Sequence, residues 1–319
     1  MAESECHDGL LTLDDLAQHT STWVEPISTS YRGHRVYELP PNGQGLVTLE
    51  ALNLISAYAE RRQAKEETGE VGRLHVLVEA LKLAFADARA HITDPDFAEI
   101  PVEQLLSRSY AAERSRLISK RANSEIKPGL MSSDTVYVTV VDEERNCVSL
   151  INSVYEHFGS GLVGGETGIV LQNRGALFSL DEGHPNCVAP GKRPYHTIIP
   201  AMVFHKGGDR PWLSFGVVGG FMQPQGQVQI LSNLIDRGMG LQEAIDAPRV
   251  RWLEGASIVL EPNIPDGVQN ALSERGHKIL AWSEAMGGFG GAQAILIDPE
   301  TNMLYGASDP RKDGCAQGF

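Results

Sequence analysis

The sequence predicts a layered α+β fold in which a mainly helical first part precedes a part built mainly of strands. Apolar residues recur at helical spacing through much of the first 130 residues, and an alternating β-branched segment begins at Thr135. Short apolar runs separated by turn residues then continue towards the C-terminus. Helices followed by a sheet with further helices are typical of a layered α+β domain.

Helices are predicted in several segments of the first part. Thr12 is followed three residues later by Asp15, which resembles a helix start, and apolar residues keep helical spacing over residues 48–64 and 74–92. A further helix is expected to begin with Pro101 at its first position, because proline needs no hydrogen-bond partner there.

A β-hairpin is predicted from Thr135. Residues 135–142 read Thr-Val-Tyr-Val-Thr-Val-Val-Asp, residues 143–146 form the turn, and residues 147–155 return as the second strand.

Later segments give shorter patterns. Strand-like runs occupy residues 168–171, 198–204, 213–218, 258–260, 278–282 and 294–297, and helix-like runs occupy residues 228–235 and 241–247.

Composition and charge exclude several classes of partner. The 319 residues suggest one large or two modest domains. The net charge is −14 and Lys/Arg-rich runs are absent, so we expect no nucleic-acid partner. The sequence has no apolar stretch of about 18 residues and does not begin with a signal-peptide pattern. We therefore expect no membrane association and a cytoplasmic location.

The four cysteines are expected to be free thiols. Cys6, Cys147, Cys187 and Cys315 lie far apart, with no CxxC pair and no Cys/His spacing suited to zinc. We therefore expect no metal site, and nothing in the sequence requires an organic cofactor.

Three features could carry chemistry. The first is Asp134–Thr135 at a loop-to-strand junction, the second is the glycine-rich segment 158–165, and the third is the glycine-rich segment 216–220. Each alone is a weak indication, because a threonine that opens a strand is usually only a strand former and glycine pairs usually form turns.

Taken with further motifs along the chain, these features resemble the gamma-glutamyltransferase family of N-terminal nucleophile hydrolases, and especially its gamma-glutamyltransferase-like branch. The similarity keeps the same order from residue 9 to residue 311. The stretches that carry it are GLLTLDDL at 9–16, YRG at 31–33, PP at 40–41, DPDF at 94–97, TVVD at 139–142 with Asn146, FGSG at 158–161, PGKRP at 190–194, GG at 219–220, APR at 247–249 and YGASDPR at 305–311.

The resemblance implies a four-layer αββα sandwich that is N-terminally incomplete, since the heavy subunit of this family normally begins well before the GLLTLDDL stretch. Residues 1–134 would be the C-terminal part of the heavy subunit, mainly helical, and residues 135–319 the light subunit. The two subunits would arise by self-cleavage between Asp134 and Thr135 and remain associated. A complementary chain that supplies the missing N-terminal half is a possible partner.

The resemblance also implies catalytic roles. The freed Thr135 would be the nucleophile, and its new α-amino group, with a pKa of about 7.7 to 8.0, would be the adjacent base. Backbone N–H groups of Gly219 and Gly220 match the family's oxyanion hole. Ser153 stands where the family has a threonine that contacts the nucleophile; the alternative is a serine that only hydrogen-bonds within the sheet.

The residues that would bind substrate depart from the family pattern. The resemblance places Asn173, Arg174, His196 and Thr197 in the pocket, but Arg174 replaces a glutamine and Leu177 replaces the acidic residue that holds a glutamyl amino group. An arginine offers bidentate binding to a carboxylate. The alternatives are a turn-forming Asn173, a surface Arg174 and a buried structural His196.

The sequence therefore leads to a hypothesis with two alternatives. The hypothesis is a self-processing gamma-glutamyltransferase-like amidohydrolase or acyltransferase that cleaves small gamma-glutamyl, glutathione-type amides through an acyl-threonine intermediate. One alternative is a truncated, non-catalytic subunit or pseudoenzyme that needs a partner chain. The other is an acylase for a non-glutamyl substrate.

Overall fold

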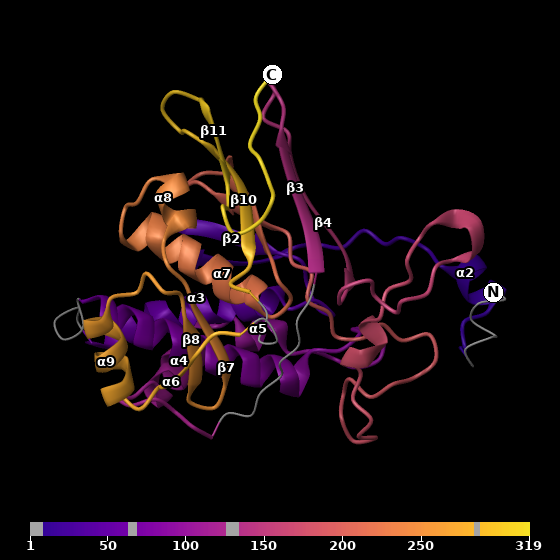
Figure 1. Ribbon diagram of the computed structural model, residues 1–319, viewed down its shortest axis with the longest axis horizontal. Helices are drawn as coiled ribbons and strands as arrows, with labels where there is room; N and C mark the ends of the chain where they lie inside the picture. The colour runs from indigo at the N-terminus through magenta and orange to yellow at the C-terminus, as the bar shows by residue number, and fades with distance from the viewer. Residues whose placement is uncertain (1–8, 63–68, 126–133, 284–287) are drawn as a thin grey trace.

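The structure, a computed structural model, describes residues 9–62, 69–125, 134–283 and 288–319. Its centre is a six-stranded antiparallel sheet in the order β1-β2-β5-β6-β10-β11. Figure 1 labels β2, β10 and β11 of this sheet. The sheet joins the two ends of the sequence, because two strands come from the first 40 residues and four from beyond residue 200. The strands are β1 (Ile27–Tyr31), β2 (His34–Glu38), β5 (Ala201–Phe204), β6 (Pro211–Val218), β10 (Gly291–Ile297) and β11 (Leu304–Ser308).

Helices cover one face of this sheet. Helix α3 (Gly45–Arg62) contacts β1 and β2, helix α7 (Met222–Leu231) contacts β6, and α4 (Glu70–His91) packs against both helices. Alternate β6 side chains, Leu213, Phe215 and Val217, are fully buried. Helix α7 approaches closely because Gly226 lies against Val217, where a larger residue would clash with the valine methyl groups.

A two-stranded hairpin covers the other face. Strands β3 (Asp134–Val141) and β4 (Cys147–Tyr155) pair antiparallel (Figure 1). Both strands contact β6. Thr139 Oγ1 lies 2.6 Å from Ser214 Oγ, and the Tyr137 ring lies directly over Gly216. Residues 214 and 216 alternate with the β6 side chains that face the helices, so β6 is sandwiched between the two layers.

The outward face of the hairpin is apolar and exposed. The described residues thus form three stacked layers, helices, sheet and hairpin, and place no helix on the outside of β3–β4. Five large apolar side chains on that face are between 45% and 64% exposed: Val136, Val138, Val140, Val148 and Leu150.

The remaining elements lie around this core. They are α2 (Leu13–Gln18), α5 (Val102–Leu105), α6 (Arg108–Arg114), α8 (Leu241–Asp246), α9 (Asp266–Glu274), the short helices η1 (Ser115–Leu117), η2 (Gly165–Thr167), η3 (Arg174–Leu177) and η4 (Ser232–Asp236), and a second sheet of β7 (Val250–Glu254), β8 (Ser257–Leu260) and β9 (Lys278–Leu280). None of the described helices is both long and apolar enough to cross a bilayer.

Buried ion pairs fix the C-terminal segment. Arg249 Nη2 lies 2.6 Å from Asp309 Oδ2, and both side chains are almost completely inaccessible. Asp309 also accepts a hydrogen bond from Arg311, which in turn binds Glu261 at 2.6 Å. Because an unpaired buried charge is costly, these residues hold β11 and the following tail against β7 and α8.

Several sequence predictions are confirmed. Thr12 caps α2, α3 and α4 occupy the two long periodic segments, and the hairpin begins at residue 134. Cys147, Cys187 and Cys315 are free thiols, and Cys6 lies outside the described residues.

Other predictions of secondary structure were wrong. Pro101 is the N-cap of α5 and not its first helical residue. The apolar run 168–171 makes only an isolated bridge between Val163 and Val170, and the strands β1 and β2 were missed. The β1 sequence, Ile-Ser-Thr-Ser-Tyr, has too few apolar residues to indicate a strand. β1 lies at the edge of the sheet and pairs with β2 only.

Gly216 permits the close packing of the hairpin on the sheet, since a Cβ at this position would overlap the Tyr137 ring. We expect Gly216→Ala to lower the free energy of unfolding by about 1–3 kcal/mol, as over-packed core positions do. The matched control is Gly267→Ala in α9, where a Cβ would meet only open space. Denaturant titration of both variants measures the effect, and equal stabilities would contradict this description of the packing.

Candidate active site

Thr135 lies in the second position of β3 and is only 9% exposed. Its Oγ1 donates a hydrogen bond of 3.1 Å to Ser153 Oγ on β4. Ser153 Oγ also accepts a 2.9 Å hydrogen bond from the backbone N–H of Tyr155. The strand register is irregular between Asp134 and Val136, and this bulge is where Thr135 stands. The structure therefore brings Thr135 and Ser153 into direct contact.

The packing of β3 on β6 places Thr135 at the end of β6. Thr139 faces Ser214 and Tyr137 faces Gly216. A step of two residues towards the start of β3 therefore matches a step of two residues towards the end of β6. Continuing this register sets Thr135 opposite Val218, and both residues line the same cavity. Gly219 and Gly220 follow directly after Val218.

The glycine pair forms the sharp turn between β6 and α7. Gly219 and Gly220 have φ values of +118° and +59°, which strongly favour glycine. The Gly220 carbonyl is fixed by a 2.8 Å hydrogen bond from Gln44 Nε2. Neither glycine N–H donates a hydrogen bond to another part of the described chain. Backbone N–H groups held in this way at a strand-to-helix turn are suited to stabilise an oxyanion.

Arg174 is brought close to Thr197. The Arg174 side chain is 7% exposed, and its Nη1 donates a 3.2 Å hydrogen bond to Thr197 Oγ1. Burial lowers the Arg174 pKa to about 10, so the guanidinium stays charged at neutral pH. The structure thus makes Arg174 an interior residue, so the surface alternative is wrong, and its role in binding substrate stays a prediction.

His196 is neighbour to this pair. Its backbone N–H donates to Asn42 O at 3.1 Å, and its ring Nδ1 is buried without a hydrogen-bond partner among the described residues. Burial, followed by the charge of Arg174, lowers the His196 pKa to about 4. The imidazole is therefore neutral at pH 7.

Asn173 has a structural position. Its side-chain Oδ1 accepts from the Glu156 backbone N–H at 3.1 Å, and its Nδ2 donates to the Glu156 carboxylate at 3.0 Å. Both ends of the amide are thus engaged at the start of η3. Leu177, three residues beyond Arg174, packs against the hydrophobic core.

Tyr155 was missed by the sequence analysis. It is fully buried with a φ of +82°, and its hydroxyl has no hydrogen-bond partner in the described part of the chain. The Arg174 guanidinium lies 5.5 Å from the centre of its ring. The strand pattern that ends at this tyrosine predicts neither its left-handed backbone nor its contact with an arginine about 20 residues later in the chain.

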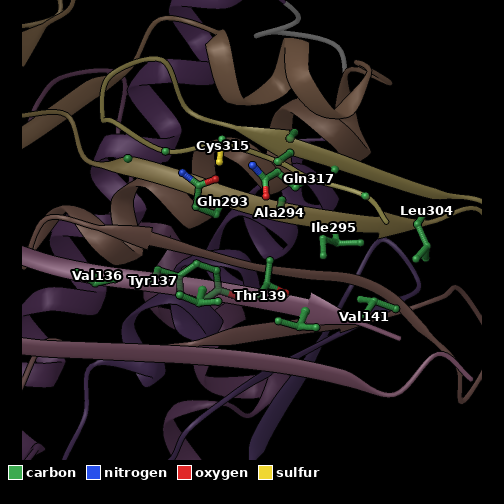
Figure 2. Close-up of a pocket in the computed structure, with 18 of the residues that line it drawn as sticks. Val136, Tyr137, Thr139, Val141, Gln293, Ala294, Ile295, Leu304, Cys315 and Gln317 are labelled. Carbon is green, nitrogen blue, oxygen red and sulfur yellow. The ribbon is translucent and has the colours of Figure 1, made fainter. Parts of the chain in front are cut away.

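A cavity of about 1100 Å³ runs from Thr135 along β3 to the C-terminal tail. Figure 2 shows Tyr137 and Thr139 on one side of it and Gln293, Ala294 and Gln317 on the other. Its lining includes neither Arg174 nor Gly219, so the cavity meets the candidate site at Thr135 only.

One group of side chains has the composition of a metal site. His75, Glu79 and His277 are buried, and their potential ligand atoms lie within 4.8 Å of one another. Each of these side chains already has a polar partner. His75 Nδ1 lies 2.8 Å from His277 Nε2, and Lys82 forms an ion pair with Glu79 at 2.6 Å. His75 and Glu79 lie on α4, which is on the helical side of the sheet. The group is therefore separate from the hairpin that carries Thr135.

These features are those of the N-terminal nucleophile hydrolase fold: stacked layers of strands with a hydroxyl residue at the start of an inner strand, opposite a glycine turn. The comparison with known sequences agrees, because the family description Gamma-glutamyltranspeptidase matches residues 1–319. The chain belongs to the gamma-glutamyltranspeptidase family.

Relatives in this family carry different activity names. The chain is 42% identical over 315 residues to a glutathione hydrolase-like proenzyme (YwrD) of Bacillus subtilis, covering 97% of this chain and 58% of that protein. It is 38% identical over 319 residues to the oxamate amidohydrolase proenzyme of Klebsiella pneumoniae, with the same coverage of 97% and 58%. The chain therefore spans little more than half the length of these relatives.

A solved structure confirms the fold. The cephalosporin acylase from Bacillus halodurans superposes with a TM-score of 0.88 at 45% identity, over 99% of this chain and 57% of that one. The predicted α+β fold of the N-terminal nucleophile hydrolases is thus confirmed, with this chain covering about half of the full-length structure.

Self-cleavage before Thr135, which the family resemblance implies, provides a test of the contact between Ser153 and Thr135. Ser153→Ala removes the acceptor of the Thr135 hydroxyl, so we expect the fragment 135–319 to appear about tenfold more slowly, the worth of one hydrogen bond. Ser153→Thr retains the hydroxyl and is the matched control. Quantifying the fragment over time measures the rates, and an unchanged rate in Ser153→Ala would show that the contact has no role.

Proposed function

We propose that the protein is a self-processing amidohydrolase or acyltransferase in which Thr135 forms an acyl ester with its substrate. The observation that carries this proposal is the position of the Thr135 hydroxyl. It is held by Ser153 at 3.1 Å, at the end of β6 where Gly219 and Gly220 turn the chain. Membership of the gamma-glutamyltranspeptidase family and relatives described as proenzymes support it.

Self-cleavage would use the same hydroxyl. Thr135 Oγ1 attacks the carbonyl carbon of Asp134, the peptide C–N bond breaks, and the nitrogen takes the proton to become the α-amino group of Thr135. Water then hydrolyses the ester and leaves a free carboxyl group on Asp134. The chain thereby gains a base with a pKa of about 7.7 to 8.0 beside its nucleophile.

Amide cleavage would follow the same course. The α-amino group accepts the hydroxyl proton while Thr135 Oγ1 attacks the substrate carbonyl, and the N–H groups of Gly219 and Gly220 donate to the oxyanion. The amide C–N bond then breaks, and the leaving amine takes the proton. Water or another amine finally removes the acyl group from Thr135. One oxyanion donor typically contributes about 2.7 to 4 kcal/mol to lowering the barrier.

The substrate is proposed to be a small acyl amide, of which a gamma-glutamyl amide is one form. The relatives include proteins named glutathione hydrolase, oxamate amidohydrolase and acylase, so the family covers more than one acyl group. Leu177 supports a non-glutamyl acyl group in this chain, because it stands where the resemblance places the acidic residue that holds a glutamyl amino group.

A non-catalytic subunit is the second candidate function. The exposed apolar face of β3–β4 favours it, because an uncovered patch of this kind indicates a surface that another polypeptide covers. The occupant proposed here is a complementary N-terminal half, on which both folding and activity of the chain would depend.

Intact-mass analysis of the purified 319-residue chain separates the two candidates. The first proposal predicts fragments of residues 1–134 and 135–319, the second beginning with Thr135. Thr135→Ala should remain a single chain, because it has no hydroxyl to attack Asp134, whereas Thr135→Ser should still be cut.

A wild-type chain that stays uncut alone and is cut after addition of the proposed complementary N-terminal half would favour the second candidate. A chain that stays uncut under both conditions would contradict self-processing. Hydrolysis of an acyl anilide by the isolated chain, abolished in Thr135→Ala, would eliminate the non-catalytic subunit.

A further inference from the structure

Gln44 is a completely buried glutamine that connects two segments of the candidate site. Its side-chain Nε2 donates one hydrogen bond to the Gly220 carbonyl at 2.8 Å and another to the Thr197 carbonyl at 2.7 Å. A carboxamide nitrogen carries two hydrogens, so each carbonyl accepts one of them. A single nitrogen atom therefore holds the glycine turn after β6 next to the segment that contains Thr197.

The orientation of the Gln44 amide is fixed as well. The Tyr195 hydroxyl donates a hydrogen bond of 3.2 Å to Gln44 Oε1. The reverse orientation would direct the amide oxygen at two carbonyl oxygens, which have no hydrogen to donate. Both polar atoms of the side chain thus have partners, and a buried polar group that is satisfied in this way specifies one geometry.

The backbone at Gln44 is attached to the same segment. The Gln44 N–H donates to the His196 carbonyl at 3.1 Å, and the His196 N–H donates to the Asn42 carbonyl at 3.1 Å. Asn42 Nδ2 also donates to the Pro194 carbonyl at 2.6 Å. These bonds hold the main chain at Gln44 in place, so the length of its side chain determines where the Gly220 carbonyl lies.

The glycine turn is otherwise bonded to its own helix. The carbonyls of Gly219 and Gly220 accept hydrogen bonds from the N–H groups of Met222 and Gln223, at 3.0 and 3.1 Å, at the start of α7. The Gln44 bond instead ties the turn to a residue 176 positions earlier in the chain. Because the carbonyl and the N–H group of Gly220 flank the same Cα atom, holding the carbonyl restrains the direction of the N–H group.

We propose that Gln44 is a positioning residue that directs the N–H groups of Gly219 and Gly220 at the oxyanion. This inference rests on the proposed function, since it concerns the oxyanion of the same reaction. Such donors lower a barrier when they are in place before the charge develops. Gln44 precedes residue 135 and Gly220 follows it, so after self-cleavage the first fragment would orient the oxyanion donors of the second.

Steady-state kinetics of the self-cleaved protein with an acyl anilide test this role. Gln44→Met keeps a side chain of similar length but removes both hydrogens that hold Thr197 and Gly220. We expect kcat to fall on the order of 100-fold, as a small misplacement of catalytic groups can cause. KM should stay within about twofold of the wild-type value, because the oxyanion donors act in the transition state.

The matched control is Gln229→Met on α7. Gln229 is 2% exposed, and its Nε2 donates to the carbonyls of Gln225 and Val250 at 3.0 and 2.9 Å. The substitution therefore removes the same kind of bonds away from the glycine turn. Both variants should lower the midpoint of thermal unfolding by similar amounts, but kcat should fall in Gln44→Met only. Equal kcat values in the two variants would mean that Gln44 has a purely structural role.

Gln44→Glu is a second variant, which decides the question if Gln44→Met does not fold. A glutamic acid has the shape of glutamine and, when protonated, donates one hydrogen bond to one of the two carbonyls. An ionised carboxylate would repel both carbonyl oxygens. The ratio of its kcat to that of the wild type should therefore fall as the pH rises, and a ratio that does not change with pH would contradict the proposal.

The glycine signals provide a readout without catalysis. In the uncut Thr135→Ala chain labelled with ¹⁵N-glycine, Gln44→Met should shift the amide signals of Gly219 and Gly220, and Gln229→Met should leave them in place. Unmoved signals, or a loss confined to KM, would overturn the proposal. A wild-type protein without turnover would refute the proposed function, and the glycine signals would still decide whether Gln44 holds the turn.

Discussion

The face-to-face packing of the β3–β4 hairpin on β6 determines where the chemistry can occur. Gly216 gives space to the Tyr137 ring, and the hydroxyls of Thr139 and Ser214 meet at 2.6 Å. Both contacts fix the same register, and that register carries Thr135 to the end of β6, where the glycine turn begins. A shift by one residue would turn Thr135 towards the outward face and bring Val136 inward.

The hairpin is unusual because its inward face is the more polar one. Tyr137 and Ser149 hydrogen-bond to each other at 2.6 Å, and Ser149 also donates to Ala201 O on β5. Buried polar groups that are satisfied in this way specify one arrangement of the two layers. Val136, Val138 and Val140 of β3 face outward and are exposed, so the hairpin presents an apolar surface that the described residues leave uncovered.

The sequence predicted what depends on local pattern and on family resemblance. It located the hairpin start, the long helices and the fold, because periodicity and ordered motifs are readable along the chain. It left open whether Arg174 is buried, and it missed Tyr155, because burial and a left-handed backbone arise from contacts with distant segments. The His75–His277 contact joins residues 202 positions apart and has no local pattern at all. The motif residues Arg249, Asp309 and Arg311 proved to form a buried ion-pair network that supports the sheet.

We propose that the Thr135 hydroxyl carries the acyl group during turnover. The most direct measurement is rapid acid quenching of the self-cleaved protein with a hydrolysable acyl anilide, followed by mass analysis of residues 135–319. We expect one added acyl group, located by peptide fragmentation on the N-terminal threonine. An adduct on another residue, or turnover with no adduct under any quench time, would contradict it.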